Sequence, residues 1–407
     1  MSRPLPVEHV RLARLAETHG TPLYVYHADT IRSRVAQLSS FDVVRYAQKA
    51  NPNLSILRLV AGQGCAVDAV SAGEVLRALE AGFEPDRIAY TADVFDDDAR
   101  EQVAGNPIRV NCGSLDMLPA LAAARPGAQV TLRVNPGFGH GHAPGVSTGG
   151  RASKHGIWHA DLPRSLGLAR TLGLTVTGLH VHVGSGSDLE NLTEAARVFE
   201  DNASALRESL RTLSAGGGLP VPYRDGEGPF DVGAHFSAWD AARRRIGERV
   251  GRRLDLEVEP GRFLVAESGV LVARVLGTKS NDDVVFVLLD AGFHTLVRPA
   301  LYGAFHRIVP LTPRGGAPRR TVVAGPLCES GDVFTRSRSG EWEPRVMAPL
   351  APGDLVAIAD AGAYGMSMAS RYNSQPLPAE VLVDGGEARL IRRRETHQDL
   401  WRHEVGD

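Results

Sequence analysis

Short runs rich in β-branched and other apolar residues recur along the first two thirds of the chain, at steps of about twenty residues. Stretches with the apolar spacing of helices lie between them. Near-continuous apolar strands that alternate with helices are typical of a parallel sheet buried on both faces. The eight runs lie at 43–47, 66–70, 88–92, 108–112, 130–135, 174–183, 212–218 and 254–260. Eight such units in about 220 residues predict a (β/α)8 barrel, similar to the TIM barrel, rather than an open sheet.

Two helices can be bounded from the sequence. A helix is predicted at 72–83. Ser71 and Glu74 fit a capping box at its start, and Gly82 is expected to end it. Its predicted apolar face consists of Val75, Leu76 and Leu79. Near the N-terminus, a short amphipathic helix is expected to end at Gly20. Its predicted apolar residues are Val10, Leu12, Leu15 and Ala16.

After about residue 268 the pattern changes to strand-like runs separated by Gly, Pro and Asp turns, without a helical repeat. Such a pattern predicts a separate antiparallel β domain, either a barrel or a sandwich. At 407 residues the chain is long enough for two domains. We expect an N-terminal segment, 1–25, that packs on the β domain, a cofactor-binding barrel at 26–267 and the β domain at 268–407.

Composition excludes several classes of protein. Forty-five basic and 47 acidic residues leave a net charge of −2 without a basic stripe, so nucleic acid is not an expected partner. No run approaches the roughly 18 apolar residues of a membrane span, and the N-terminus lacks the apolar stretch of a signal peptide. The few, widely spaced cysteines indicate a reducing, cytoplasmic setting. We expect no membrane association and no metal site.

Functional-looking residues stand at nearly every predicted strand end. In a (β/α)8 barrel the chemistry takes place at the C-terminal ends of the strands. The residues at these ends are Lys49, Asp68, Ser71, Thr91, Asn111, Arg133, Asn135, His182, Gly184, Ser185, Gly216, Gly217, Gly218 and Glu259. Each has an ordinary structural explanation when taken alone, but their shared position at the C-terminal ends of the strands predicts an active site there.

Lys49 follows directly on the buried-looking run VVRYA. A lysine in such a turn is most often solvated. An amine in a desolvated pocket instead loses proton affinity and becomes a nucleophile toward carbonyl groups. Its neighbours Gln48, Asn51 and Asn53 carry no charge and would not disturb a neutral amine. We therefore expect Lys49 to reach into a desolvated pocket at the barrel mouth.

Two glycine-containing loops are candidates for holding a phosphate. Gly216, Gly217 and Gly218 could form a flexible turn, but glycines after a strand also let backbone N–H groups approach a phosphate closely. Gly261 and Arg262 follow the last barrel strand in the same way. Two such loops on adjacent strands predict one phosphate held between them.

Glu259 and His182 leave two interpretations open. A buried carboxylate at 259 needs a partner, which could be a barrel arginine such as Arg133 or the nitrogen of a heterocycle. His182 could be a core histidine or a ring stacked on a cofactor. A lysine for an aldehyde, glycines for a phosphate and a carboxylate for a ring nitrogen together describe a site for pyridoxal phosphate.

The chain resembles the fold-type III pyridoxal-phosphate decarboxylases, and specifically diaminopimelate decarboxylases of the enterobacterial kind. The resemblance runs over essentially the whole chain, and the number of ordered motifs makes it specific. They lie at 43–53, 67–82, 132–142, 147–158, 178–186, 214–223, 259–271, 298–306 (RPALYGAFH), 325–334 (GPLCESGDVF), 362–374 and 392–396.

The resemblance implies a role for each matching residue. Lys49 would hold the cofactor covalently, His182 would stack on its ring and Glu259 would pair with its ring nitrogen. Asp68, Glu74 and Arg133 would organise the site around the lysine. The residues implied around the phosphate are Ser185, Gly216, Gly217, Gly218, Gly261, Arg262 and Tyr364.

The remaining motifs imply how the substrate is bound. Arg298 and Tyr302 would hold the far carboxylate of diaminopimelate, since a guanidinium binds a carboxylate through two parallel hydrogen bonds. An ion pair between Arg298 and Asp290 is the structural alternative. The substrate-binding residues implied are Arg262, Arg298, Tyr302, Glu329 and Tyr364.

The GPLCES motif implies a loop that reaches the neighbouring subunit's site in a homodimer with shared active sites. Cys328 would be the acid that reprotonates the substrate carbon, and Glu329 would bind a substrate nitrogen. The alternative for Cys328 is a small buried hydrophobe. Its acidic neighbours Glu329 and Asp332 favour the acid.

The implied reaction is decarboxylation of meso-2,6-diaminopimelate at its D-configured carbon to give L-lysine, the last step of lysine biosynthesis. His294, Thr295 and Gln375 depart from the usual pattern, so a paralogue acting on D-lysine, D-ornithine or another amino acid is the nearest alternative, against which Arg298 argues. Racemases resembling this fold place an arginine at the ring nitrogen. A non-catalytic pyridoxal-phosphate-binding regulator would not need Lys49, Cys328 and Glu329 together.

Overall fold

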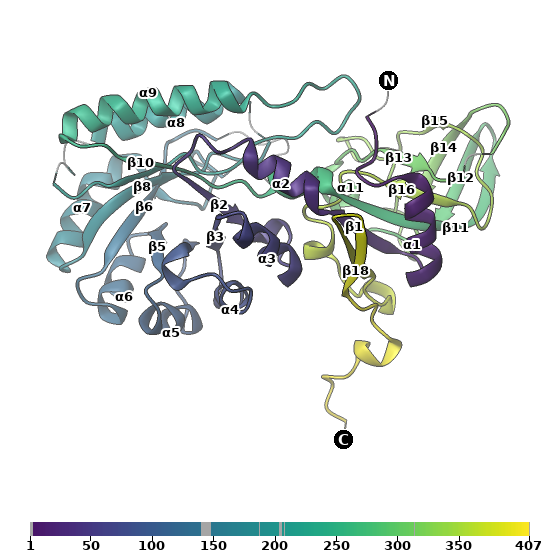
Figure 1. Cartoon of the computed structure of the whole chain (residues 1–407), viewed down its shortest axis with the longest axis horizontal. Coiled ribbons are helices and arrows are strands. Elements are labelled where there is room, and N and C mark those ends of the chain that lie inside the picture. The colour runs from purple at the N-terminus through teal and green to yellow at the C-terminus, as the bar shows by residue number, and fades with distance from the viewer. Residues whose placement is uncertain are drawn as a thin grey trace. The chain divides into compact units, whose positions relative to one another are not determined.

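The computed structural model describes residues 3–139, 148–186, 188–202, 206, 208–312 and 314–406. Residues 140–147, which include parts of the motifs predicted at 132–142 and 147–158, lie outside the described residues. The chain divides into two compact units (Figure 1). The barrel unit consists of Arg32–Val221 and Pro229–Leu264, and the β unit consists of Met1–Ile31, Pro222–Gly228 and Val265–Asp407.

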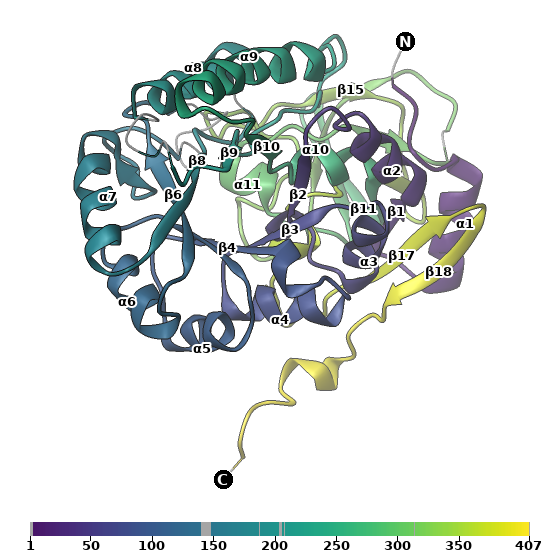
Figure 2. The same ribbon diagram turned by 60° about the vertical axis from the view of Figure 1, so that its left-hand side comes forward.

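The barrel unit contains the predicted closed ring of eight parallel strands (Figure 2). Neighbouring strands pair in the order β5-β4-β3-β2-β10-β9-β8-β6, and pairing between β5 and β6 closes the ring. A two-residue strand, β7 (Ile157–Trp158), adds to the side of β6. The barrel strands are β2 (Val43–Ala47), β3 (Ala66–Ala69), β4 (Ile88–Ala92), β5 (Arg109–Cys112), β6 (Gln129–Asn135), β8 (Thr175–Val181), β9 (Thr212–Ser214) and β10 (Asp255–Val258).

Helices connect successive barrel strands, and Figure 2 shows α4 to α9 outside the ring of strands. They are α3 (Leu54–Gly62), α4 (Ala72–Glu80), α5 (Asp97–Gly105), α6 (Met117–Ala124), α7 (Leu162–Thr171), α8 (Leu189–Asn202) and α9 (Val232–Val250). The helix α2 (Ala28–Ala36) precedes the first barrel strand, and the short α10 (Arg262–Val265) follows the last. None of the helices in the described parts of the chain is long and apolar enough to cross a membrane.

The start of α4 shows one half of the predicted capping box, because Glu74 accepts from Val70 and not from Ser71, and its predicted apolar face was partly wrong. The Ser71 hydroxyl accepts the backbone N–H of Glu74 at 3.2 Å, and the Glu74 carboxylate accepts the N–H of Val70 at 2.8 Å. Leu76 is 51% exposed, while Val75 and Ala78 are buried. Residues three apart on a helix share a face, and the small Ala78 completes the buried stripe.

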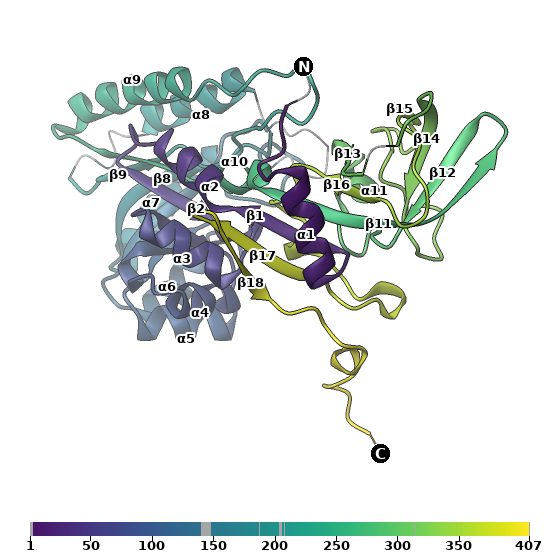
Figure 3. The same ribbon diagram turned by 45° about the vertical axis from the view of Figure 1, so that its right-hand side comes forward.

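The β unit is built on a nine-stranded sheet in the order β15-β14-β12-β11-β1-β17-β18, with β16 joining β11 to β13 (Figure 3). Its strands are β1 (Leu23–His27), β11 (Gly269–Asn281), β12 (Val284–Leu289), β13 (Ile308–Pro310), β14 (Arg319–Ala324), β15 (Arg345–Met347), β16 (Leu355–Ile358), β17 (Ala379–Asp384) and β18 (Glu387–Arg392).

The prediction of a purely antiparallel β domain was wrong, because two pairs of strands in this sheet are parallel. The N-terminal strand β1 inserts between β11 and β17 and runs parallel to β17. Strand β14 runs parallel to β12. About thirty residues, including the helix α11 (Arg298–Tyr302), separate these two strands, which is long enough for the crossover that parallel pairing requires.

The N-terminal helix α1 (His9–His19) ends at Gly20, as expected. Leu12, Leu15 and Ala16 join the apolar core of the β unit. Val10 is 72% exposed, so its inclusion in the apolar face was wrong. Val10 lies two positions from Leu12 and six from Ala16, which places it on the opposite side of the helix.

A short segment of the predicted barrel domain, residues 222–228, lies in the β unit. The ring of Tyr223 lies 5.5 Å from the imidazole of His306, and the guanidinium of Arg224 lies 4.2 Å above the ring of Phe305. These aromatic and cation–π contacts fix the segment between β9 and α9 to the β unit.

Candidate active site

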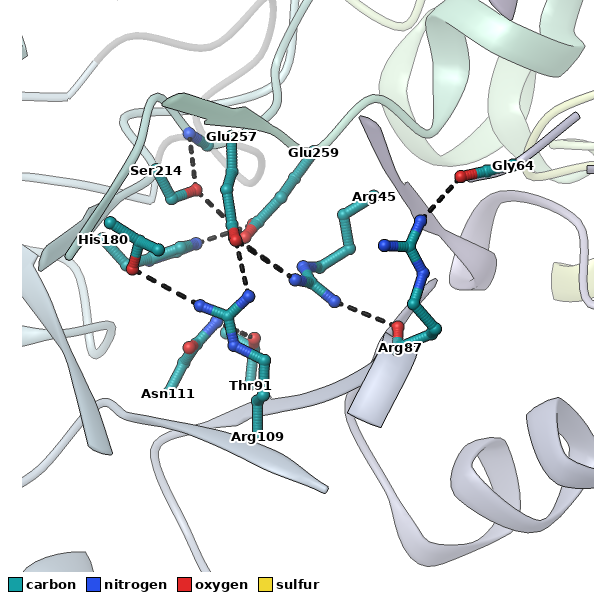
Figure 4. A network of polar contacts seen from close by, with 12 residues as sticks. Arg45, Gly64, Arg87, Thr91, Arg109, Asn111, His180, Ser214, Glu257 and Glu259 are labelled. Carbon is teal, nitrogen blue, oxygen red and sulfur yellow. Dashed lines mark hydrogen bonds and ion pairs between the residues drawn. The ribbon is translucent and has the colours of Figure 1, made fainter. Parts of the chain in front are cut away.

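Glu259 immediately follows β10, and its carboxylate is buried inside the barrel. Its Oε2 lies 2.6 Å from Nε2 of His180, and its Oε1 accepts a hydrogen bond from the Ser214 hydroxyl at 3.0 Å (Figure 4). Burial alone would raise the pKa of Glu259, but the neighbouring His180 lowers it to about 2. The carboxylate is therefore ionised at neutral pH.

The suggested ion pair between Glu259 and Arg133 was wrong. Arg133 is buried, yet its side chain makes no hydrogen bond or ion pair with any residue in the described parts of the chain. Burial lowers the pKa of Arg133, whereas the nearby carboxylates of Asp93, Glu259 and Asp68 raise it in part. The guanidinium thus stands among three acids without contacting them directly, and Glu259 is instead bonded to His180 and Ser214.

A second carboxylate, Glu257, lies two residues earlier on the same face of β10. Arg45 Nη2 lies 3.3 Å from its Oε2, and Arg109 Nη1 lies 2.6 Å from its Oε1 (Figure 4). Burial raises the pKa of Glu257, but the two arginines outweigh it and hold the pKa below the ordinary value. Next to Glu259, the barrel interior therefore contains a carboxylate, Glu257, whose charge is balanced by two arginines.

The ring of His182 is held by the main chain of the glycine turn. Its Nδ1 accepts the N–H of Gly217 at 3.0 Å. Burial, followed by the positive charges of Lys49 and Arg133, holds the pKa of His182 well below its usual range. The imidazole is therefore neutral and fixed in orientation, as a ring that stacks on a flat cofactor would need to be.

The three glycines after β9 form a turn that excludes any side chain. A Cβ on Gly216 would lie 1.9 Å from the carbonyl oxygen of Val181. On Gly217 it would lie 2.3 Å from that of Glu259, and on Gly218 it would lie 2.1 Å from that of Gly184. Gly216 and Gly218 also have φ values of 67° and 96°, which glycine adopts readily. Only glycine fits this turn, and glycine turns that follow a strand are a common place for a phosphate to approach the main chain.

A second loop lies beside this turn. Arg262, the first residue of α10, donates from Nη2 to the Ser185 hydroxyl at 3.0 Å. A Cβ on Gly261 would lie 3.1 Å from the carbonyl oxygen of Ala47. The structure thus brings together the loops after β8 and β10, with the glycine turn after β9 between them in the order of strands.

Lys49 lies in a single 3₁₀ turn, Gln48–Ala50, directly after β2. Its side chain is exposed, so the predicted desolvated pocket was wrong for the structure described. The turn buries Gln48 and Ala50 on either side and leaves the lysine at the surface. The Gln48 side chain donates to the carbonyl of Glu74 at 3.0 Å, and Asn53 caps α3. These polar neighbours therefore hold the turn in place.

Asp68 and Glu74 lie near this lysine. Burial and the charge of Glu259 raise the pKa of Asp68 to about 6, while Lys49 and a hydrogen bond from Thr91 counteract them. Burial likewise raises the pKa of Glu74. Asn111 donates to the Thr91 hydroxyl at 2.7 Å. Side chains from four strand ends thus form one polar network around the barrel mouth.

Arg298, in the β unit, is only 2% exposed. Its Nη1 donates to Nε2 of His306 at 2.8 Å, and its guanidinium carbon lies 4.9 Å from the centre of the Tyr223 ring. The alternative partner, Asp290, instead accepts hydrogen bonds from the Thr21 hydroxyl and the N–H of Arg274. Tyr302, at the end of the same short helix, is half-buried.

Cys328 is exposed, so the alternative of a small buried hydrophobe was wrong. Its N–H is donated to the Asn373 side chain at 3.0 Å. The buried Asp332 carboxylate accepts the backbone N–H groups of Phe293 at 2.6 Å and Leu327 at 2.8 Å. These bonds anchor a loop that presents Cys328 and the exposed Glu329 at the surface.

Three further residues of the motifs lie in the β unit. Tyr364 is half-buried and has a φ of 57°, an uncommon backbone conformation for a bulky residue. His294 and Thr295, which depart from the family pattern, are buried. Burial lowers the pKa of His294 to about 4, and Thr295 bonds the carbonyl of Gly292 at 2.8 Å. Both departures therefore pack within the unit.

Sequence reasoning missed several residues of this site. His180 and Glu257 each lie two positions before a predicted site residue, so the alternation of a strand could have placed them on the same inward face. Ser214 lies two residues before Gly216, the first residue of the glycine turn. Tyr223, His306 and Asn373 carried no comparable signal, because their contacts come from loops far apart in the sequence.

Comparisons with known proteins agree with this geometry. Residues 28–266 match the family described as pyridoxal-dependent decarboxylase, pyridoxal binding domain. The chain is 49% identical over 398 residues to diaminopimelate decarboxylase from Escherichia coli, covering 96% of this chain and 95% of that protein. It is also 49% identical to the diaminopimelate decarboxylase of Streptomyces coelicolor, with coverages of 98% and 92%.

Solved structures give the same result. A crystal structure of diaminopimelate decarboxylase aligns with a TM-score of 0.95 and 47% identity, covering 99% of this chain and 98% of that one. The Helicobacter pylori enzyme complexed with L-lysine aligns with a TM-score of 0.86 and 34% identity, covering 97% and 99%. This chain therefore belongs to the diaminopimelate decarboxylase family of pyridoxal-dependent decarboxylases.

Proposed function

We propose that this protein uses pyridoxal phosphate to decarboxylate meso-2,6-diaminopimelate, giving L-lysine and CO2 in the last step of lysine biosynthesis. The observation that carries the proposal is the arrangement at the barrel mouth. There an ionised carboxylate, a neutral imidazole and a turn that only glycine can form converge from adjacent strands. Near-full-length identity of 49% to relatives named for this reaction supports the same substrate.

The residues present fit the cofactor. Gly216, Gly217 and Gly218, with Ser185, Gly261 and Arg262, would hold its phosphate, because glycine turns let a phosphate approach the main chain closely and Arg262, bonded to Ser185, supplies a positive charge. The other cofactor contacts that we propose are Lys49, Asp68, Arg133, His182, Glu259 and Tyr364. When bound, pyridoxal phosphate supplies a protonated ring that takes up the electrons released by decarboxylation.

Each protein group has one task in this proposal. Lys49 supplies an amine for the covalent attachment of the cofactor, and its exposure leaves the amine accessible. Glu259 stays ionised, so that it can accept a hydrogen bond from a protonated ring nitrogen. The neutral His182 offers a flat face, and its Nδ1 is already occupied by Gly217.

Arg298 and Tyr302, together with Arg262, Glu329 and Tyr364, are the proposed substrate contacts. A guanidinium as buried as that of Arg298 is suited to a carboxylate, since the two groups form two parallel charge-assisted hydrogen bonds. Cys328 is the proposed acid that returns a proton to the substrate carbon, and it is exposed on an anchored loop.

We further infer a cytoplasmic homodimer in which the loop of Cys328 and Glu329 completes the partner's active site. The exposure of both residues supports this arrangement, because a loop that serves another subunit must present its side chains outward. The three cysteines are free, in keeping with a reducing compartment. The domain boundaries at 26–267 and 268–407 are part of the same proposal.

The proposal is tested by CO2 release from the purified protein with pyridoxal phosphate, with meso-diaminopimelate and D-lysine run side by side. We expect release from diaminopimelate alone. Release from D-lysine alone would keep the cofactor and Lys49 but overturn the substrate. No release from either, in protein that binds the cofactor, would favour a non-catalytic regulator.

A further inference from the structure

The two oxygens of the Glu259 carboxylate are each occupied by a donor from a neighbouring strand. His180 comes from β8 and lies 2.6 Å from Oε2, and Ser214 comes from β9 and lies 3.0 Å from Oε1 (Figure 4). Glu259, His180 and Ser214 are 6%, 1% and 3% exposed. Water therefore cannot solvate this carboxylate, and these two side chains take its place.

His180 is dedicated to this contact. Its Nε2 carries the hydrogen, since the carboxylate of Glu259 can only accept. Its other ring nitrogen, Nδ1, is buried and has no hydrogen-bond partner among the described residues. A buried imidazole that is satisfied only through Glu259 contributes little to the barrel beyond holding that carboxylate.

Ser214 connects the same carboxylate to the glycine turn. Its hydroxyl donates to Glu259 and accepts the N–H of Gly216 at 3.2 Å. The orientation of the carboxylate is thereby coupled to the main chain that would hold the phosphate. This one hydroxyl would therefore link the position of the carboxylate that faces the ring nitrogen to the position of the turn that holds the phosphate.

Glu257, a second buried carboxylate next to Glu259, is neutralised by Arg45 and Arg109. Glu257 lies two residues away, and like-charge repulsion from Glu259 raises the pKa of Glu257. Arg45 and Arg109 neutralise Glu257 at 3.3 and 2.6 Å. His180 is the neighbour that lowers the pKa of Glu259 most, and Arg45 and His182 lower it further.

We propose that His180, assisted by Ser214, is a positioning residue that keeps the Glu259 carboxylate ionised and oriented to pair with the protonated ring nitrogen of pyridoxal phosphate. The inference rests on the proposed function for the identity of the cofactor. Without the two donors, burial would favour the protonated carboxyl group. A protonated Glu259 could no longer keep a proton on the ring.

The test uses full-length protein and cofactor labelled with ¹⁵N in its ring. His180→Leu removes the donor at similar volume, His180→Gln retains an N–H donor, and Ser214→Ala removes the hydroxyl. His235→Leu is the matched control, because His235 is a fully buried histidine of the same unit outside this network. The readouts are the dissociation constant for pyridoxal phosphate and the ¹⁵N chemical shift of its ring nitrogen between pH 5 and pH 9.

We expect His180→Leu to weaken cofactor binding roughly 10- to 100-fold, as loss of a hydrogen bond to a charged group does. Its ring-nitrogen shift should move toward the unprotonated value as the pH rises. His180→Gln should restore the wild-type ¹⁵N shift, and His235→Leu should leave that shift unchanged. Ser214→Ala should move the ¹⁵N shift of the ring nitrogen less than His180→Leu does.

An unchanged ¹⁵N shift and an affinity within twofold of wild type in His180→Leu would overturn the inference and leave the proposed function standing. Failure of the wild-type protein to bind pyridoxal phosphate would overturn both. If His180→Leu does not fold, Ser214→Ala decides the question by the same two readouts, and wild-type behaviour in that variant contradicts the inference.

Discussion

Arg298 donates a hydrogen bond from Nη1 to Nε2 of His306 over 2.8 Å, and the other ring nitrogen of His306 lies 2.9 Å from the carbonyl oxygen of Ala359. Because Nε2 accepts, the hydrogen of the imidazole is on Nδ1 and is donated to the main chain. The guanidinium is thus held by a group that is itself fixed to the sheet. This arrangement presents a cation of fixed orientation, as selection of a carboxylate requires.

His306→Leu should therefore raise KM for diaminopimelate roughly tenfold and leave kcat within about threefold, because the substrate loses a well-oriented partner. Steady-state kinetics measures both constants. His403→Leu, at an exposed histidine of the same unit, is the control and should change neither. An unchanged KM in His306→Leu would show that His306 does not position Arg298.

Cys328 should be the one thiol that reacts readily in the native protein. Cys65 and Cys112 are buried, and burial raises their pKa values to about 11 and about 12, whereas Cys328 is exposed. Treatment with iodoacetamide at pH 8, followed by peptide mass spectrometry, should find the label at Cys328. Labelling of Cys65 or Cys112 as fast as that of Cys328, or faster, would contradict this prediction.

The catalytic role of Cys328 is tested separately. Cys328→Ala should lower kcat roughly 100-fold, in the range of a lost general acid, while pyridoxal phosphate remains bound. Cys112→Ala should keep kcat near wild type, although removal of a buried side chain lowers its stability. Unchanged turnover of Cys328→Ala would remove the thiol from the mechanism.

Gly217→Ala should abolish cofactor binding, because the new Cβ would lie 2.3 Å from the carbonyl oxygen of Glu259. Equilibrium titration with pyridoxal phosphate measures the loss. Gly167→Ala is the matched control, since a Cβ at this helical position in α7 meets nothing within 4 Å. It should bind normally and gain up to about 1 kcal/mol in stability. Wild-type affinity in Gly217→Ala would argue against the glycine turn as the phosphate site.

Asp68 should destabilise the cofactor-free protein at neutral pH. Its folded-state pKa of about 6 lies above the ordinary 3.8, so between these values the folded protein holds a proton that the unfolded chain has lost. The penalty grows as the pH rises through this window and is complete above it. Glu259 has the opposite sign, since its pKa of about 2 makes its contribution present above about 4.5 and lost toward pH 2.

Asp68→Asn should accordingly stabilise the cofactor-free protein by up to about 3 kcal/mol at pH 8, with the gain shrinking toward pH 4. Urea unfolding at the two pH values measures the difference. Asp116→Asn, at an exposed aspartate, should show no such pH-dependent gain. A gain for Asp68→Asn that is equal at both pH values would contradict the pKa of Asp68.

The barrel was predictable from the sequence because its strands are buried on both faces, which makes each one a continuous apolar run between helices. Strands β2 and β4 were predicted to the residue. The parallel pairing of β1 with β17 was not predictable, since it depends on where β1 inserts between strands some 250 and 350 residues away. Alternation within a strand carries no information about its neighbours.

The candidate site was predicted in part for the same reason. Glu259, His182 and the glycine turn follow strand ends, whose position the fold class determines. The exposure of Lys49 was missed, because it depends on the conformation of one short turn. The partners of Glu259 were also missed. Several barrel residues could have reached it, and only the structure selects His180 and Ser214 over Arg133.

The most direct test of the proposed function is L-lysine formation from meso-diaminopimelate by the protein with pyridoxal phosphate, measured by chiral chromatography for the wild type and for Lys49→Ala. We predict stoichiometric L-lysine from the wild type and a rate at least about 1,000-fold lower from Lys49→Ala, as expected when a covalent catalytic group is lost. No L-lysine from the wild type, or an equal rate from Lys49→Ala, would contradict the proposed function.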